Sequence, residues 1–447
     1  MPVSELLDAA PVTRRHWRIT LVIGLGLFFD IFDVFLAGVL STVLTKSFGL
    51  SQATLPLVLG SSFFGMFFGA LFMGAIADRI GRRHAFLLNL GIYSLFTLAG
   101  SLSPTAVALI VTRFFAGIGI GAQMPLSDAY LSELLPARVR GKLISVAYTI
   151  GFCGIPAIGL GARVLVPLNL LGVEGWRWLF VSGSFGGIVI WALQRYVVES
   201  PRWLESAGKS EEARNITAFL LELPVESINP IAQSGQKEQT PRQSYLALFA
   251  PGNCRRMLML YVFQIFQIIG YYGFGTMVPL VLAHKGLSVL TSLTYTTVAF
   301  LGYPVGSALS LFIVEKIDRR LLIMISALIM GAFGLALGFA TSPFLIGMFG
   351  ILYTLVSNIF SNAFHILQGE IFPTAIRGRA AGSAYGLSRL SSAAMPFILL
   401  PVLNNYGAGI MFTVVAGAML IVVADIGLFA PHTTGRKLEQ IAADLRG

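Results

Sequence analysis

The sequence predicts an all-α membrane protein with twelve transmembrane helices, arranged as two pseudo-symmetric six-helix bundles. Three observations lead to this fold class. The chain is 55% hydrophobic and only 12% charged, its apolar residues lie in long unbroken stretches, and a repeated motif relates its two halves. Because soluble domains carry about 25% charged residues, this composition excludes an ordinary soluble protein.

The apolar stretches have the length of membrane-spanning helices. A hydrocarbon core of about 30 Å is crossed by about 20 helical residues, and backbone polar groups in lipid must be satisfied within the segment itself. Transmembrane strands would give short alternating segments, which these are not. We expect spans near 18–45, 53–77, 84–102, 105–132, 141–165, 176–197, 257–283, 289–314, 320–340, 343–369, 377–403 and 406–430.

The positive charge follows the predicted topology. The chain has a net charge of +10, and 25 of its 31 Lys and Arg residues fall on one side if the N-terminus lies in the cytoplasm. Positive residues favour cytoplasmic loops. We therefore expect both termini in the cytoplasm, and we interpret the charge as a topology signal, not as a nucleic-acid-binding patch.

Motifs of enzymes and of metal sites are absent from the sequence. The two cysteines, Cys153 and Cys254, predict neither a disulfide framework nor a metal cluster. A Walker A loop, a His-Glu-x-x-His motif and a Ser/His/Asp pattern are also missing. The sequence therefore predicts neither an enzyme nor an ATP-driven pump, and it predicts no cofactor, with protons as the expected coupling ion.

One long polar stretch divides the spans six and six. It predicts an N-terminal half at 1–198, a cytoplasmic linker at 199–255, and a C-terminal half with a cytoplasmic tail at 256–447. An internal repeat supports this division, because residues 133–141 (ELLPARVRG) parallel residues 370–378 (EIFPTAIRG) at an offset of 237. Adding the same offset to Asp78 gives Glu315, and the loop after Asp78 corresponds to the loop after Glu315. Parallel repeats of this kind place a binding site between the halves near the membrane midplane.

Several of these segments resemble the major facilitator superfamily. Residues 74–83 reproduce its signature loop between the second and third helices, and residues 113–125 look like its fourth-helix motif in the form found in aromatic acid–proton symporters. Residues 199–204 are similar to the sequence after the sixth helix of sugar porters and organic-ion transporters. Residues 370–396 have the spacing of organic anion transporters. Residues 30–33 look like the paired aspartates of aromatic-acid and metabolite symporters, with isoleucine in place of their usual glycine.

Asp30 and Asp33 are the candidate proton-coupling residues, with Arg113 as their counter-charge. The two aspartates lie three residues apart and so share one helix face, in the middle of the first span, where ionised groups are costly and usually functional. We expect one of them to take up and release a proton, and the resemblance implies that Arg113 controls this exchange. The alternative is a static ion pair that locks the first and fourth helices together.

Arg389 is the candidate substrate contact. It lies near the middle of the eleventh span, it matches the arginine position of organic anion transporters, and a guanidinium binds a carboxylate with two hydrogen bonds. The alternative is an ion pair with an acid such as Asp30 or Asp33. Further polar and aromatic candidates share helix faces or stand in spans, with interhelical hydrogen bonding or packing as the alternative: Gln264, Gln267, Tyr271, Asn358, Asn362, His365, Tyr148 and Tyr385, with Tyr272 as a further aromatic.

Charged residues at the expected cytoplasmic helix ends form the candidate gate. The resemblance implies that their salt bridges close this side of the protein during transport, whereas the alternative is that they only set topology. They are Asp78, Arg82, Glu133, Arg140, Glu315, Arg319, Glu370 and Arg377. Asp128 and Arg163 are expected nearer the opposite ends of their spans, and Asp425 is interpreted as structural.

The function expected from these features is secondary active transport. The leading hypothesis is proton-coupled uptake of a small organic anion such as an aromatic carboxylate. The alternatives are a sugar or neutral metabolite porter and a drug or metabolite exporter. A monomer in the lipid bilayer of a bacterial inner membrane is expected, with a small-molecule substrate and no nucleic-acid partner.

Overall fold

The computed structural model describes residues 3–228, 248–314, 316–372 and 374–431, with the side chains of 3–5, 75, 195, 251, 252, 369 and 374–378 left undescribed. Almost all of the described chain is helical. Short connections join the helices, and the described strands form one small hairpin in which β1 (Asn169–Leu170) pairs antiparallel with β2 (Val173–Glu174).

Twelve membrane crossings account for the long helices, as the sequence predicts. Ten helical stretches of the described chain are long and apolar enough to cross a membrane. One of them, α18, makes two crossings, and the shorter α10 makes another. In the first half the helices are α2 (Arg14–Val39), α3 (Ser41–Phe48), α4 (Thr54–Ile80), α5 (Arg82–Ser101), α6 (Ala106–Gly121), α7 (Gln123–Leu134), α8 (Arg140–Phe152), α9 (Gly154–Leu165) and α10 (Gly175–Ala192). In the second half they are α13 (Pro251–His284), α14 (Val289–Phe300), α15 (Gly302–Ile313), α16 (Arg319–Phe339), α17 (Pro343–Glu370) and α18 (Thr374–Phe429).

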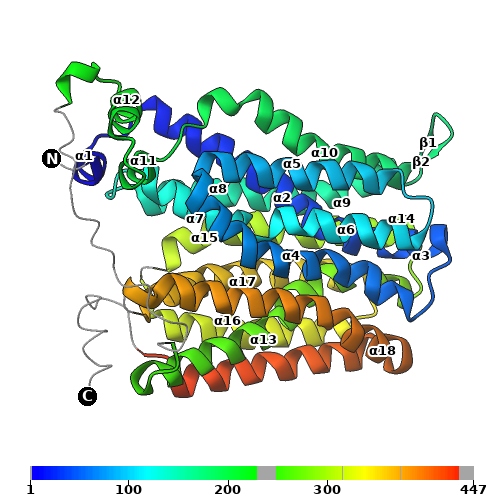
Figure 1. Cartoon of the computed structure of the whole chain (residues 1–447). Coiled ribbons are helices and arrows are strands. Elements are labelled where there is room, and N and C mark those ends of the chain that lie inside the picture. The colour runs from blue at the N-terminus through cyan, green and yellow to red at the C-terminus, as the bar shows by residue number, and fades with distance from the viewer. Residues whose placement is uncertain (1–2, 229–247, 315, 373, 432–447) are drawn as a thin grey trace.

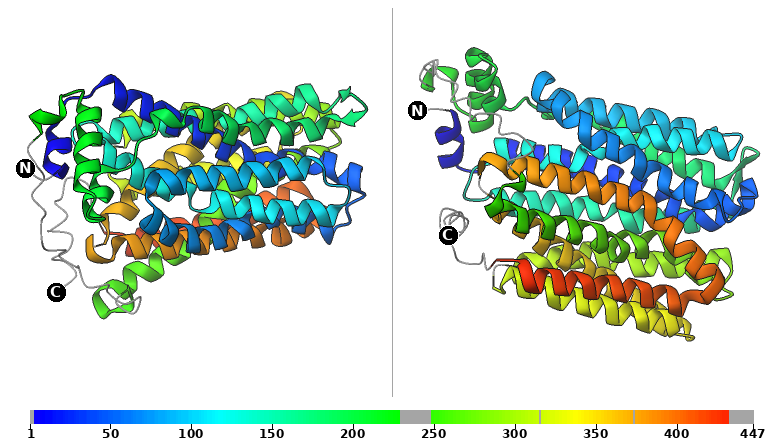
Figure 2. Two further views of the ribbon diagram at one scale, coloured as in Figure 1. Left: turned by 45° about the horizontal axis from the view of Figure 1, so that its top comes forward. Right: turned by 60° about the horizontal axis from the view of Figure 1, so that its bottom comes forward.

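The two halves lie side by side with their helices running along one common direction (Figures 1 and 2). Three short helices, α1 (Val3–Ala9), α11 (Pro201–Ser206) and α12 (Ser210–Leu221), gather at one end of the molecule. The opposite end carries α3 and the β1–β2 hairpin. We refer to these two ends as the α11/α12 end and the hairpin end.

The bend inside α18 separates the eleventh span from the twelfth. Gly407 has φ 82° and ψ 176° there, a conformation that glycine adopts without steric cost. The chain reverses at this point, so that the last part of α18 runs back toward the α11/α12 end (Figure 2). The two predicted spans, 377–403 and 406–430, are therefore two helices that share the label α18 and meet at the non-helical residue Gly407.

The internal repeat is visible in three dimensions. Arg82 Nε lies 3.2 Å from Glu133 Oε1, and Arg319 Nε lies 3.6 Å from Glu370 Oε1. Each residue of the second pair follows its counterpart in the first pair by the offset of 237. Two ion pairs related in this way indicate that the halves have the same internal arrangement.

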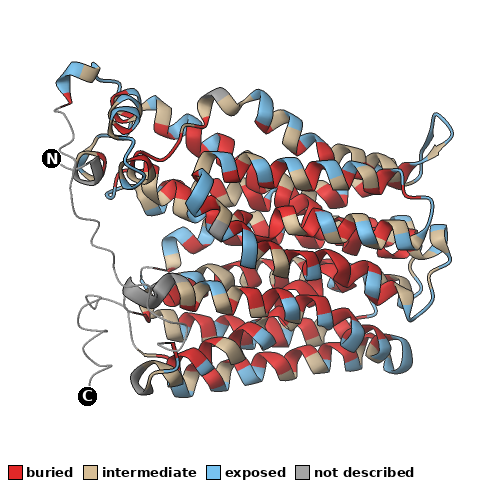
Figure 3. Ribbon diagram, viewed as in Figure 1, coloured by how far each residue is buried: buried red, intermediate tan, exposed pale blue. Residues whose placement is uncertain are grey.

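Buried residues concentrate where helices contact each other (Figure 3). Close approaches of backbone join the halves: a Cβ at Gly60 of α4 would lie 2.6 Å from the carbonyl oxygen of Ala393 of α18, and one at Gly38 of α2 would lie 2.8 Å from Cα of Thr276 of α13. Large apolar side chains such as Phe339 and Phe344 are strongly exposed. Such an apolar exterior suits a surface that faces lipid, because lipid tails are as apolar as the side chains that contact them.

Candidate substrate cavity and buried charge pair

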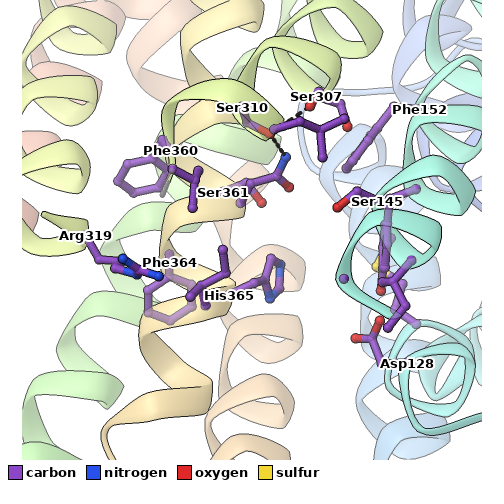
Figure 4. Close-up of a pocket in the computed structure, with 18 of the residues that line it drawn as sticks. Asp128, Ser145, Phe152, Ser307, Ser310, Arg319, Phe360, Ser361, Phe364 and His365 are labelled. Carbon is purple, nitrogen blue, oxygen red and sulfur yellow. Dashed lines mark hydrogen bonds between the residues drawn. The ribbon is translucent and has the colours of Figure 1, made fainter. Parts of the chain in front are cut away.

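A cavity of about 950 Å³ lies between the halves. Side chains of α7 and α8 form one wall, and side chains of α13, α15, α17 and α18 form the other (Figure 4). Arg138, Lys142 and Arg319 line its mouth. Lys142 and Arg319 lie in the first turns of α8 and α16, and Arg138 lies in the loop before α8, all at the α11/α12 end. The cavity therefore extends from the middle of the molecule toward that end.

Arg389 of α18 lines the deep part of this cavity and is only 1% exposed. Its Nη1 donates to the hydroxyl of Tyr272 at 3.0 Å, and its Nη2 donates to the hydroxyl of Tyr385. Nη2 also lies 4.0 Å from Sδ of Met124 across the cavity, while Nε is buried without a hydrogen-bond partner. Among the described residues Arg389 forms no ion pair, so the alternative that it pairs with Asp30 or Asp33 is not what the structure shows.

The structure brings eight of the nine predicted substrate contacts to the cavity wall. They are Arg389, Gln264, Gln267, Tyr271, Asn362, His365, Tyr148 and Tyr385. The ninth, Asn358, lies behind the wall: its Nδ2 donates to the carbonyl oxygen of Tyr303 at 2.6 Å, and its side chain is fully buried. Asn358 thus has the interhelical role that was the alternative for these residues.

Amide side chains on the cavity wall are linked to one another. Gln267 Nε2 donates to Gln264 Oε1 at 3.0 Å, and Gln264 Nε2 donates to Gln368 Oε1 at 3.2 Å. Asn362 Nδ2 donates to Ser310 Oγ at 2.5 Å. Each amide keeps further donor or acceptor capacity, so these side chains can hold the helices together and still contact a ligand.

Asp128 lies elsewhere than the sequence analysis expected. The expectation of a position toward the hairpin end of its span is wrong, because α7 ends at Leu134 and the next residues lead to the α11/α12 end. Asp128 lines the cavity together with Tyr148 and is exposed to it. The predicted span 105–132 already ends four residues after Asp128, next to the loop at the α11/α12 end, so the expected depth was inconsistent with that span.

Arg113 and Asp33 form a fully buried ion pair. Arg113 Nη1 donates to both carboxylate oxygens of Asp33, at 2.9 and 2.8 Å, and Nη2 donates to the Asp33 carbonyl oxygen at 2.9 Å and to Ser62 Oγ at 3.1 Å. Thr97 adds a hydrogen bond to Asp33 Oδ1 at 2.8 Å. The pair therefore connects α2, α4, α5 and α6.

Asp30 has a different environment, although it lies one helical turn from Asp33. It is 1% exposed, and neither of its carboxyl oxygens has a hydrogen-bond partner in the described part of the chain. The buried side chain of Tyr93 lies near both aspartates. Asp30, Asp33 and Arg113 are not among the residues that line the cavity.

The candidate gate residues form ion pairs within each half. Arg82 Nη1 lies 3.0 Å from Asp78 Oδ1, in addition to the Arg82–Glu133 contact. Arg140 pairs with Asp8 of α1 at 2.5 Å, and the same Asp8 oxygen lies 2.8 Å from Arg202 Nη2. Glu315 and the side chain of Arg377 fall outside the described residues. That these groups close the cavity in another state stays a prediction.

Glu199 is a structural residue at this end that the site prediction did not include. Its Oε1 accepts hydrogen bonds from the backbone N–H groups of Arg82 and Arg83, at 2.8 and 3.1 Å. A carboxylate at a helix N-terminus satisfies unpaired donors and complements the helix dipole. Glu199 therefore joins the start of α5 to the segment after α10. The only sign in the sequence was the resemblance of residues 199–204 to transporter motifs.

The comparisons with known proteins agree with this architecture. The family described as "Sugar (and other) transporter" matches residues 19–445. The putative metabolite transport protein YyaJ of Bacillus subtilis is 30% identical over 439 residues, which cover 97% of this chain and 96% of that protein. The niacin transporter NiaP of Acinetobacter baylyi is 29% identical over 460 residues, covering 99% and 100%.

Two further matches bear on fold and relatives. The 4-hydroxybenzoate transporter PcaK of A. baylyi is 27% identical over 435 residues, covering 95% of this chain and 92% of that protein. The partially occluded inward open structure of the xylose transporter XylE from E. coli superposes with a TM-score of 0.78 at 23% identity, covering 95% and 100%. The chain shares its fold with XylE, which is described as a major facilitator superfamily proton:xylose symporter. Because the family matches nearly the whole sequence, this chain belongs to the sugar (and other) transporter family, and it is a multi-pass membrane transporter.

Proposed function

We propose that this transporter couples the uptake of a small organic anion, an aromatic carboxylate, to the inward movement of protons by alternating access. The observation that carries the proposal is Arg389, a guanidinium buried beside a central cavity without an acidic partner among the described residues. A charged side chain in the middle of a membrane protein is costly unless it is paired or used for binding.

The charge of the cavity supports an anionic substrate. Four of its lining residues are Lys or Arg, of which Arg319 is paired with Glu370, and one lining residue, Asp128, carries a carboxylate. The hydroxyl groups of Tyr272 and Tyr385 satisfy Arg389 with hydrogen bonds but leave its charge uncompensated. A substrate carboxylate supplies that charge, and the planar guanidinium can hold both of its oxygens.

The cavity wall also supports an aromatic substrate. Tyr148 and Phe152 line it from α8, Tyr271 and Tyr272 from α13, and Tyr385 from α18. Aromatic rings stack favourably, offset or edge to face, on other rings. A ring held between these side chains would place its carboxylate at Arg389.

Asp30 is the group that we assign to proton transfer. The charge of Asp33 is compensated by Arg113, whereas the carboxyl group of Asp30 is buried with no partner in the described chain. A lone buried carboxylate is unfavourable, and the group becomes neutral by holding a proton. A change of conformation that admits water or moves Arg113 would release that proton.

A second candidate function is transport of a sugar or another neutral metabolite. The amide side chains of Gln264, Gln267 and Asn362 on the cavity wall can donate to and accept from hydroxyl groups. Relatives include a protein described as the arabinose-proton symporter of B. subtilis, 26% identical over 462 residues. In this case Arg389 would hold Tyr272 and Tyr385 in place instead of binding substrate.

Several further assignments belong to this proposal. We place the α11/α12 end and both termini in the cytoplasm of a bacterial cell, with the protein in the inner membrane. The protein would function as a monomer without a cofactor, with halves at 1–198 and 256–447 joined by a linker at 199–255.

The experiment that tests the proposal is uptake of a labelled panel of aromatic carboxylates and pentoses into proteoliposomes with an imposed inward proton gradient. The variants are Asp30→Asn, Asp33→Asn and Arg389→Ala, with Arg14→Ala, an exposed arginine outside the cavity, as the matched control. Gradient-stimulated uptake of an acid that is lost in Asp30→Asn and Arg389→Ala and kept in Arg14→Ala is the expected result. Uptake of pentoses alone, unchanged in Arg389→Ala, would replace the proposal with the second candidate.

A further inference from the structure

We infer that Asp128 forms a second polar contact for the substrate, opposite in charge to Arg389, and that it selects aromatic carboxylates which carry a hydroxyl or amino group at their far end. This inference rests on the proposed function, because it assumes that Arg389 binds the carboxylate. It narrows the substrate class from aromatic carboxylates in general to those with a hydrogen-bond donor.

Asp128 lies on the cavity wall. Its carboxylate points into the cavity from α7, on the side opposite His365 of α17 (Figure 4). Among the residues that line the cavity it is the one carboxylate, because Asp30 and Asp33 lie outside it. Asp128 forms no ion pair among the described residues and caps neither end of α7, which begins after Ala122 and ends before Leu135.

The distance between Asp128 and Arg389 follows from the contacts of Met124. Met124 and Asp128 are four residues apart on α7, so they share a helix face and differ in height by about 6 Å. Met124 Sδ contacts Arg389 Nη2 at 4.0 Å and the hydroxyl of Tyr385 at 3.3 Å. Asp128 therefore lies about one helical turn from Arg389, toward the cavity mouth. A single aromatic ring with substituents at both ends spans such a separation.

A hydrogen-bond donor on the ligand suits the chemistry of Asp128. An ionised carboxylate accepts hydrogen bonds and cannot donate them. Tyr148 of α8 hydrogen-bonds Asp128, which leaves further acceptor positions on the carboxylate, and the described residues give it no cation. A hydroxyl or amino group of the ligand would supply a second donor, whereas a methoxy group or a bare ring edge would not. Sites that hydrogen-bond a substrate donor discriminate strongly against analogues without it, because the site's own polar group is then left unpaired.

The test compares the uptake of four acids into proteoliposomes. These acids are benzoate, 4-hydroxybenzoate, 4-aminobenzoate and 4-methoxybenzoate. The proteins are the wild type, Asp128→Ala and Asp128→Asn. The matched control is Asp425→Asn, which alters a buried carboxyl group of α18 that does not line the cavity. Size-exclusion elution and melting temperature show whether each variant is folded.

The expected result is a preference of about tenfold or more for the hydroxyl and amino compounds over benzoate and 4-methoxybenzoate in the wild type and in Asp425→Asn. This ratio falls toward one in Asp128→Ala. In Asp128→Asn the amide can also donate a hydrogen bond to the methoxy oxygen, so that the uptake of 4-methoxybenzoate rises relative to that of benzoate. If Asp128→Ala does not fold, the uptake ratios of the wild type and of Asp128→Asn are compared instead, and they test the role of Asp128.

Two outcomes would overturn the inference, and they are distinguishable. Equal uptake of all four acids by the wild type, or an unchanged ratio in Asp128→Ala, removes the role of Asp128 and leaves the proposed function intact. Failure of the wild type to take up any of the four acids removes the proposed function itself, and the inference falls with it.

Discussion

Arg113 donates from one nitrogen, Nη1, to both carboxylate oxygens of Asp33, at 2.9 and 2.8 Å, in a site where neither side chain has any exposed surface. The two residues stand 80 positions apart in the sequence. Their contact gives the two neighbouring aspartates of α2 separate roles, because Asp33 has its charge compensated and Asp30 does not. The first two predictions follow from this difference.

The first prediction concerns stability. Asp33→Ala leaves the Arg113 guanidinium buried without its counter-charge, and removing one partner of a buried pair costs about 3–5 kcal/mol. We expect a clear fall in the melting temperature of the detergent-purified protein. The double variant Asp33→Ala/Arg113→Ala should recover part of the loss because no lone charge remains. The contrary outcome is additivity: the double variant would be less stable than Asp33→Ala by as much as Arg113→Ala alone is less stable than the wild type. That result would show that the two residues do not interact.

The second prediction separates proton coupling from substrate movement. Asp30→Asn keeps the size of the side chain but removes the group that we expect to carry the proton. Exchange of external for internal substrate at equal pH should continue, while accumulation driven by a proton gradient should be lost. Both are measured in proteoliposomes, with Asp425→Asn as the control. Accumulation that persists in Asp30→Asn would assign proton transfer to another residue.

The third prediction concerns the geometry of Arg389. Its guanidinium donates to Tyr272 and Tyr385 through two different nitrogens, which a lysine ammonium cannot reproduce from one position. Arg389→Lys should therefore raise the KM for a carboxylate substrate by about tenfold or more, as expected when one charge-assisted hydrogen bond of about 1.5–3 kcal/mol is lost. Initial uptake rates across substrate concentrations give this value. A KM equal to that of the wild type would mean that positive charge alone is sufficient.

The fourth prediction concerns the contact between the halves at the hairpin end. A Cβ at Gly159 of α9 would lie 2.8 Å from Oγ1 of Thr297 of α14, so Gly159→Phe forces the two helices apart. Overpacking costs about 1–3 kcal/mol, enough to shift a two-state equilibrium about tenfold. The variant should favour states that are open at the hairpin end and closed at the α11/α12 end.

Thiol labelling measures this shift. The two native cysteines, Cys153 and Cys254, are replaced by serine, and Arg138→Cys places one thiol at the cavity mouth. Labelling of that thiol should slow in Gly159→Phe. Gly91→Phe is the control, because nothing lies within 4 Å of a Cβ at Gly91. Equal labelling rates in the two phenylalanine variants would show that the Gly159 contact does not control access.

Local sequence patterns predicted much of the candidate site. The faces formed by Gln264, Gln267 and Tyr271 and by Asn362 and His365 follow from helical periodicity, which places residues three or four apart on one side of a helix. Those faces do line the cavity. The same periodicity also included Asn358, which lies behind the wall. Only part of this face of α17 borders the cavity, and Asn358 belongs to the other part.

By itself, the sequence determined the fold class, the twelve crossings and the pseudo-symmetry of the halves. These follow from the length of apolar stretches, which must match the membrane, and from the motif repeated at an offset of 237. Tertiary structure alone decided that Arg113 binds Asp33 and leaves Asp30 without a partner, that Arg389 contacts Tyr272 and Tyr385, and that Asp128 faces the cavity. These outcomes depend on how helices distant in sequence rotate and shift against one another, and no pattern within a single helix encodes that packing.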